Sequence, residues 1–249
     1  VAVKYRRTGT SAWQDALPLY RVHAELVAGG MATPEFAGSI FDLAPATSYD
    51  IQLTAHDPDG GDQTTTLSAT TRPVPAADPA NPHAVNVSTA AQLQTALDAA
   101  QPGDVITLAA GTYAGEFTLN PSGTAANPIV IRGADRDAVI LDGGNGGGNV
   151  LAVEGSFTHV ERLTLQHDTR ALRFHGSPAQ GNVVRRVHAK DVVLGFGSNP
   201  QQQDFYLCDN LLEGRLVWPA VYADDGGAHA NDDGIHVEGS GHVVCHNTI

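Results

Sequence analysis

The sequence predicts an all-β protein whose larger part, residues 85–249, is a right-handed parallel β-helix with an N-terminal capping helix. Three observations predict it: segments that recur every 21 to 24 residues, short runs of alternating apolar and polar residues, and one amphipathic helical stretch before the repeats. The composition agrees, because 27 glycines and 14 prolines in 249 residues favour many short strands joined by turns, and 42% apolar residues suffice for a core.

Two sets of segments define the repeat. The first set aligns without gaps at 160–165, 184–189, 207–212 and 244–249, with starts 24, 23 and 37 residues apart. The second begins at Asn149, Ala171, Val192 and Gly234, with separations of about 22, 21 and 42. This period with short strands is typical of one β-helix coil, whereas leucine-rich repeats need paired leucines and a helical segment in each repeat. In the first set, Asn210 and Asn247 share a column and can hydrogen-bond between coils.

Other columns predict contacts between neighbouring coils, which lie ~4.8 Å apart. Glu161 precedes Arg185, and Arg186 precedes Asp209, so we expect these pairs to meet at the surface. Cys208 and Cys245 share a column as well. If their coils are adjacent, their Cα separation falls in the disulfide range of roughly 4.4–6.8 Å. The alternatives are a bridge, which implies an oxidising compartment, and two free thiols.

The helical stretch follows a capping box at 89–92. Leu93, Ala96, Leu97 and Ala100 form one apolar stripe, and Pro102 with Gly103 ends the helix. A single amphipathic helix before a series of strands suits a lid over the open end of a solenoid, where an edge would otherwise be unpaired.

Residues 1–72 alternate apolar and polar positions in short runs, which indicates strands with one buried face. The stretch 43–51 resembles the E–F corner of fibronectin type III domains, in which a tyrosine, here Tyr49, bonds back to the preceding corner through its hydroxyl. The first strands of such a sandwich are missing, so we expect a partial domain and a sequence cut at both ends. Prolines at 73, 75, 79 and 82 predict a stiff extended linker over 73–84.

The net charge of −13 argues against general binding to nucleic acid or to an anionic membrane face. No apolar run approaches the ~18 residues of a membrane span, so we expect no membrane insertion. The charge is uneven, with eight Lys/Arg against six Asp/Glu over 132–190, and eight Asp/Glu against the single Arg215 over 204–238. An anionic ligand should therefore prefer the middle of the chain, and a cation its end.

The stretches 92–108, 110–113 and 122–131 closely resemble the first coil of pectate-lyase-like β-helix proteins, most of all polysaccharide lyases of the alginate lyase and chondroitinase B type. The resemblance implies a protein that is secreted or at the cell surface, expected to be a monomer, and that binds and cleaves an acidic polysaccharide by β-elimination. No position matches the catalytic lysine and arginine or the calcium ligands of those lyases, so the catalytic residues stay unassigned. The alternative is a non-enzymatic surface, adhesion or structural β-helix protein, and a glycoside hydrolase is a third possibility.

The 37-residue interval exceeds a normal coil by roughly 14 residues within 213–233, and an insertion into a regular repeat is often the binding face. In this insertion we predict substrate contacts at Trp218, Tyr222 and His229. Oxygen ligands for Ca²⁺ are predicted at Asp224, Asp225, Asp232 and Asp233. The alternative is a solvated acidic loop.

Basic residues give further candidates. Lys190, which follows Lys4 as the next lysine, is a candidate base or substrate contact, the alternative being a solvated turn lysine. Four arginines can line a groove for an anionic glycan, although Glu161 and Asp209 can neutralise two of them: Arg170, Arg173, Arg185 and Arg186. Zinc is disfavoured at His229, His236, His242 and His246, because two histidines four apart on a strand, such as His242 and His246, lie ~13 Å apart.

Overall fold

The computed structural model describes residues 1–23, 35–215 and 233–249. The chain divides into two compact units, Val1–Val74 and Pro75–Ile249.

The N-terminal unit is built from antiparallel strands: β1 (Ala2–Arg7), β2 (Gln14–Asp15), β3 (Tyr20–Val22), β4 (Glu35–Ala37), β5 (Ser48–Ala55) and β6 (Gln63–Thr70). A four-stranded sheet has the order β2-β1-β5-β6, and β3 pairs with β4. The Tyr49 hydroxyl accepts a hydrogen bond from the Ala44 amide at 2.9 Å, which is the corner contact that the sequence predicts. The assignment of this unit to the fibronectin type III family stays a prediction.

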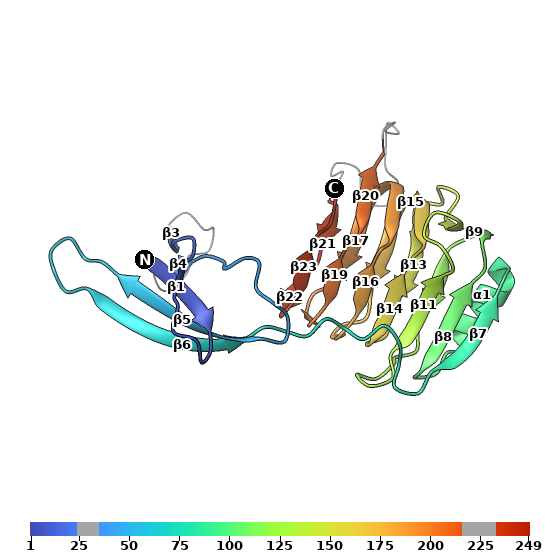
Figure 1. Cartoon of the computed structure of the whole chain (residues 1–249). Helices are drawn as coiled ribbons and strands as arrows, with labels where there is room; N and C mark the ends of the chain where they lie inside the picture. Colours follow the sequence, from blue (N-terminus) through green and yellow to red (C-terminus); the bar gives the residue numbers. More distant parts are fainter. Residues whose placement is uncertain (24–34, 216–232) are drawn as a thin grey trace. The chain divides into compact units, whose positions relative to one another are not determined.

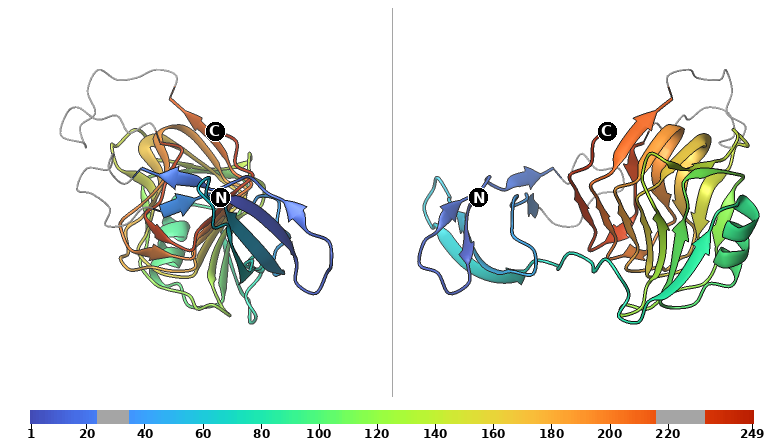
Figure 2. Two further views of the ribbon diagram at one scale, coloured as in Figure 1. Left: turned by 90° about the vertical axis from the view of Figure 1, so that its left-hand side faces the viewer. Right: turned by 45° about the vertical axis from the view of Figure 1, so that its right-hand side comes forward.

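The C-terminal unit is a parallel β-solenoid, in which successive coils stack along one axis (Figures 1 and 2). One seven-stranded sheet contains β7 (His83–Val87), β8 (Asp104–Leu108), β11 (Ile129–Gly133), β14 (Thr158–Glu161), β16 (Val183–Arg185), β19 (Tyr206–Cys208) and β23 (Val243–Cys245), paired in this order. The eight-stranded sheet contains β9 (Gly111–Ala114), β10 (Phe117–Leu119), β12 (Val139–Asp142), β13 (Asn149–Val153), β15 (Thr164–Phe174), β17 (His188–Ser198), β20 (Leu211–Gly214) and β21 (Ile235–His236). A short parallel pair, β18 (Gln202–Gln203) and β22 (Gly239–Ser240), completes the strands. The right-handed sense of the coil stays a prediction.

The register confirms the first predicted set of repeats, since Val160, Val184, Leu207 and Val244 stand opposite one another. The segments of the second predicted set also pair with one another, but their first residues are not in register. Leu151, Leu172, Phe196 and Ile235 are the residues that face one another, so Val192 lies opposite Asp168. The sequence aligns Val192 with an apolar residue of the previous coil. Its actual partner there is Asp168, which is a buried acid.

Residues with positive φ turn the chain at the corners between sheets. One corner, before the strands of the seven-stranded sheet, has Phe157, Gly181, Asp204 and Gly241 at φ of 53°, 67°, 60° and 72°. The next corner has Arg162, Arg186, Asp209 and His246 at φ between 52° and 63°. Side chains other than glycine seldom adopt this region. Its recurrence at stacked positions shows that the coil geometry, more than the residue type, imposes it.

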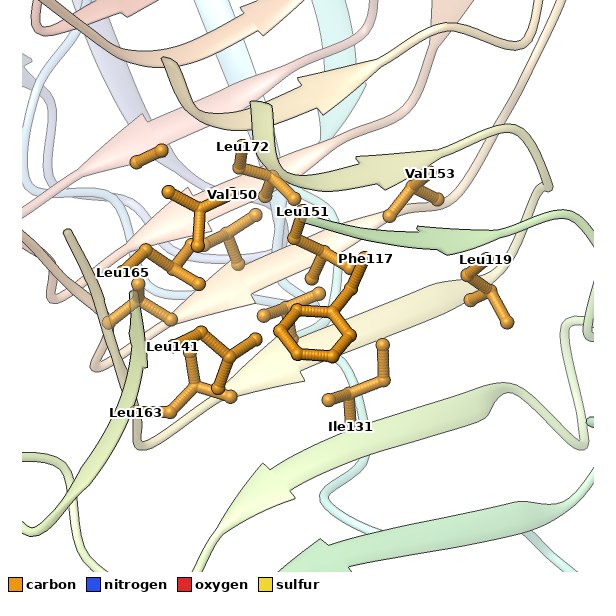
Figure 3. Close-up of a cluster of buried hydrophobic side chains, with 14 of the residues drawn as sticks. Phe117, Leu119, Ile131, Leu141, Val150, Leu151, Val153, Leu163, Leu165 and Leu172 are labelled. Carbon is orange, nitrogen blue, oxygen red and sulfur yellow. The ribbon is translucent and has the colours of Figure 1, made fainter. Parts of the chain in front are cut away.

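The core consists of stacked aliphatic side chains, with some aromatic ones such as Phe117, in the interior of the coils (Figure 3). Leu141, Leu151, Leu165 and Leu172 are fully buried, and burying each such side chain contributes roughly 1.5–3 kcal/mol. Helix α1 (Ala90–Asp98) adds Leu93 and Leu97 to this core, and the Thr89 hydroxyl caps the helix by accepting from the Gln92 amide at 3.2 Å. The function of α1 as a lid stays a prediction.

Two side-chain contacts link the last coils. Cys208 and Cys245 stand opposite each other and form a disulfide, with Cα atoms 4.7 Å apart. Asn210 Nδ2 donates to Asn247 Oδ1 at 2.9 Å, which confirms the predicted step between coils.

Residues 75–79 cross the outer surface of the seven-stranded sheet, and we call them the strap. Arg185 donates to the carbonyl oxygens of Pro75 and Ala76 at 3.1 and 3.3 Å. Arg132 pairs with Asp78 at 2.8 Å, and both arginines pair with Glu161, which lies between them. The strap belongs to the stretch predicted as linker. It covers Glu161 and Arg185, for which the sequence predicts a surface ion pair and a groove.

The Glu161–Arg185 pair exists but is not a surface pair. Only 4% of the Glu161 side chain and 8% of the Arg185 side chain are exposed. Arg185 therefore does not line an open groove, because its guanidinium is used by Glu161 and by the strap.

Candidate functional site

The outer surface formed by β12, the first halves of β15 and β17, and β20 carries a row of polar side chains, and we call it the open face. Asp142, Gln166, Lys190 and Glu213 occupy matching register positions on successive strands. The residues just before them, Leu141, Leu165, Ala189 and Leu212, are buried in the core. Strand alternation therefore directs the polar row outward.

His167 follows Gln166 at the corner where β15 bends, with φ of 57°. Its Nδ1 lies 2.9 Å from Asp142 Oδ2 on the preceding coil. Its Nε2 lies 3.6 Å from Asp191 Oδ2 on the following coil, where Asp191 has the same backbone conformation, with φ of 50°. The corner thus aligns an acid, a histidine and a second acid along the solenoid.

The Asp142 carboxylate is held by three donors. Burial alone would raise the pKa of Asp142. Hydrogen bonds from the Gln166 amide at 2.8 Å, the Gly144 backbone amide at 2.9 Å and His167 outweigh burial and lower that pKa. An ionised carboxylate can only accept, so His167 Nδ1 carries the hydrogen of this bond. In the neutral imidazole, Nε2 is then an acceptor that can take a proton.

His167 lines an open cavity of about 610 Å³, within the range of ligand pockets. The cavity walls are His167, Lys190, Asp191, Leu212, Glu213, Gly214 and Ile249. Lys190, a predicted substrate contact, is exposed here. Within the described ranges it forms no ion pair, whereas Glu213 accepts from His188 Nε2 at 2.7 Å.

Arg215 lies beneath this site, with 10% of its side chain exposed. Its guanidinium donates to the carbonyl oxygen of Asp168 at 2.8 Å and to Asn145 Oδ1 at 3.2 Å. Because these bonds join the end of β20 to earlier coils, we assign Arg215 to holding the corner in place.

Most of the predicted insertion site lies outside the described residues: Trp218, Tyr222, Asp224, Asp225, His229 and Asp232. Asp233 is described, and its Oδ2 lies 3.0 Å from His236 Nδ1. In the part of the chain that the structure describes, no group of three or more His, Cys, Asp or Glu residues could hold a metal ion. Arg170 and Arg173 lie in the second half of β15, away from the open face, and Arg173 donates to Asn199 Oδ1 at 2.6 Å.

Sequence reasoning missed Asp142, His167 and Asp191. A signal was present, because Asp142, Gln166 and Lys190 are spaced by 24 residues, as are His167 and Asp191. The repeats predicted from the sequence rest on apolar columns, whereas these residues stand in polar ones.

No family model and no curated protein matches the chain. Among solved structures, an alginate lyase from Paenibacillus sp. str. FPU-7 aligns at 22% identity and a TM-score of 0.42, over 66% of this chain and 75% of that one. The PL6 family alginate lyase AlyGC aligns at 21% identity and a TM-score of 0.42, over 52% of this chain and 21% of that one. The PL6 family polysaccharide lyase Pedsa3628 from Pseudopedobacter saltans aligns at 13% identity and a TM-score of 0.36, over 52% of this chain and 46% of that one. This chain therefore spans about a fifth of the length of AlyGC. No helix among the described residues is long and apolar enough to cross a membrane.

Proposed function

We propose that the protein binds an acidic polysaccharide on its open face and cleaves it by β-elimination. The observation that carries the proposal is the Asp142–His167 pair beside Lys190 in an open cavity on the outside of a parallel solenoid. Elimination from a uronate needs a group that neutralises the carboxylate, a base for the C5 proton and an acid for the leaving oxygen. The resemblance of residues 92–131 to the first coil of alginate lyase and chondroitinase B type enzymes supports the same substrate class.

The open face offers a residue for each task. The Lys190 ammonium attracts the uronate carboxylate. His167 Nε2 removes the C5 proton, and Asp142 stabilises the imidazolium that forms, as a carboxylate does for a catalytic histidine in other enzymes. The imidazolium then returns the proton to the glycosidic oxygen as the C4–O bond breaks and the C4–C5 double bond forms. Proton and electron pairs balance without a further reactant.

The test measures release of the unsaturated uronate from alginate, pectate and glycosaminoglycans by its absorbance. His167→Gln should reduce kcat by about 10²–10⁴-fold, which is the usual contribution of a general base. His175→Gln is the matched control, because His175 also faces a carboxylate, with Nδ1 3.3 Å from Glu154 Oε1, and is similarly exposed. The control should retain its activity.

Other outcomes separate the alternatives. Absence of unsaturated product from all these polymers refutes cleavage by elimination. Polysaccharide binding without any product supports the non-enzymatic surface or adhesion protein. New reducing ends without a double bond indicate a glycoside hydrolase, which requires a pair of facing carboxyl groups.

Further parts of the proposal concern setting and architecture. We propose a protein that is secreted or at the cell surface and acts as a monomer without nucleic acid. Its solenoid is right-handed with α1 as a lid, and Val1–Val74 is part of a fibronectin type III domain. The disulfide is consistent with an oxidising compartment. Ca²⁺ binding at Asp224, Asp225, Asp232 and Asp233 is tested by calorimetric titration, and neither heat nor a stability change would refute it.

A further inference from the structure

The glycine-rich segment 143–148, between β12 and β13, folds around the carboxylate of Asp168. This side chain is fully buried. Its Oδ1 accepts hydrogen bonds from the backbone amides of Gly147 at 2.9 Å, Gly148 at 2.7 Å and Thr169 at 2.8 Å. The segment thus takes its conformation from one carboxylate on β15.

A second carboxyl group, that of Glu116, lies against the same glycine-rich segment. Glycine permits this approach. A Cβ at Gly146 would lie 2.6 Å from Glu116 Oε1, and a Cβ at Gly148 would lie 2.6 Å from Glu116 Oε2. Burial first, and then the charge of Asp168 and the contact with it, raise the pKa of Glu116.

If both carboxyl groups are ionised, Asp168 Oδ2 has no hydrogen-bond donor. Asp168 Oδ2 is buried without a hydrogen-bond donor, and an ionised Glu116 can only accept. Neither group forms an ion pair with a Lys, Arg or His residue in the described ranges. A buried orphan oxygen costs about 1–3 kcal/mol, so a missing donor is expected.

The surrounding groups argue for a proton in preference to a metal ion. Arg215 donates to the Asp168 carbonyl oxygen, not to its carboxylate, and Asp142 is paired with His167. Arg170 contributes its backbone amide, which donates to the carbonyl oxygen of Gly148. Among the described residues, three N–H groups and no third carboxylate face Asp168, whereas Ca²⁺ needs six to eight oxygen ligands.

We propose that Glu116 and Asp168 share one proton, with the Glu116 hydroxyl donating to Asp168 Oδ2, and that this proton fixes segment 143–148 beside the open face. The segment in turn holds the site. The Gly144 amide donates to Asp142 Oδ1 at 2.9 Å, and the Asn145 amide donates to the His167 carbonyl oxygen at 2.6 Å. The pair is therefore a pH-sensitive latch on the segment that positions Asp142 and His167. It does not depend on the reaction proposed above.

The direction of the pH effect follows from the raised pKa of Glu116. The folded state binds this proton more tightly than the unfolded state does. The latch is therefore closed below the ordinary glutamate range and opens as the pH rises through the raised pKa. Opening should loosen the amides of Gly147 and Gly148 first, because they bond to Asp168 directly.

Amide hydrogen exchange of the full chain tests the latch. The readout is the protection factor of Gly147 and Gly148 relative to Leu165, a core amide on the same strand as Asp168, so that changes in global stability cancel. In the native sequence this ratio should fall about tenfold or more between pH of about 4 and about 8. Glu116→Gln keeps a donor at every pH, so its ratio should stay constant. Glu154→Gln, at a carboxyl that faces His175 and not Asp168, should behave as the native sequence does.

Three results would overturn the proposal. The first is an equal fall in the native protein and in Glu116→Gln. The second is no fall in the native protein, with Glu116→Ala as protected as the native sequence at low pH. The third is recovery of protection at high pH on adding Ca²⁺, lost in Glu116→Gln, which would make the pair a cation site.

Discussion

Two outer surfaces of the solenoid differ: the strapped surface, which is the part of the seven-stranded sheet that the strap crosses, and the open face, which carries the candidate site. On the strapped surface, the row Arg132, Glu161 and Arg185 continues in register into Cys208 and Cys245. Its charges pair with one another, its carbonyl partners come from residues 75–77, and its last step is a disulfide. On the open face, the equivalent row contains Lys190, which is exposed and lines a cavity.

The comparison teaches that stacking alone does not decide what a polar row does. Parallel coils bring equivalent positions within ~4.8 Å in both sheets. The strap takes up the arginines of one row through its carbonyl oxygens and Asp78. The other row keeps its solvent, and therefore a ligand can reach it.

The largest expected effect comes from Glu161→Gln on the strapped surface. This change leaves two arginines, one of them almost fully buried, without their shared carboxylate. Removing one partner of a buried ion pair costs about 3–5 kcal/mol. The unfolding transition of the solenoid, followed by circular dichroism in urea, should shift accordingly.

The matched control is Asp137→Asn, since Asp137 pairs with Arg136 at 2.8 Å and 65% of its side chain is exposed. An exposed pair contributes about 0–1 kcal/mol. If both variants unfold at the same urea concentration, the strapped row is not the structural element that we describe.

Much of the solenoid was predictable, because a buried column repeats with the period of the coil. The segments at 160 and 184 gave the register directly, and so did the cysteine and asparagine columns. The strap was not predictable, since four prolines indicate an extended chain but not the surface on which it lies. The first residues of the second set were misaligned because Asp168 is a buried acid, whose partners are backbone amides that no sequence pattern reveals.

The site was predictable only in part, and for a physical reason. Lys190 is recognisable from the sequence because lysine is rare in this chain, whereas Asp142 and His167 form a pair only because the corner brings them within 2.9 Å. That corner needs a positive φ at His167, a conformation that its residue type does not predict.

A smaller effect is expected at His159, which lies on the strapped surface with 6% exposure. Burial and the positive charges of Arg185 and Arg132 lower the pKa of His159 to about 4, although the negative charge of Glu161 acts in the opposite direction. Between this pKa and the ordinary histidine pKa, His159 binds a proton in the unfolded state but not in the folded state. Stability should fall as the pH drops from about 6.5 to about 4, by up to about 3 kcal/mol.

Thermal unfolding over this pH range checks the prediction for His159. In His159→Leu this part of the acid sensitivity should disappear, whereas His175→Leu, at an exposed corner, should keep it. Equal pH profiles for the native protein and His159→Leu would show that water reaches His159 beneath the strap.

The smallest effect on stability is expected at Lys190, and here the two surfaces separate most clearly. Lys190 is exposed and forms no ion pair among the described residues, so Lys190→Ala should change the free energy of unfolding by less than about 0.5 kcal/mol. The affinity of the Lys190→Ala protein for alginate, measured by calorimetry, should nevertheless fall, because the substitution removes a cation from the cavity. The loss should shrink as salt is added, since ions screen an exposed charge. If Lys190→Ala destabilised the protein as much as Glu161→Gln does, Lys190 would serve the fold and not a ligand. An unchanged affinity for alginate would likewise contradict the assignment of the open face to binding.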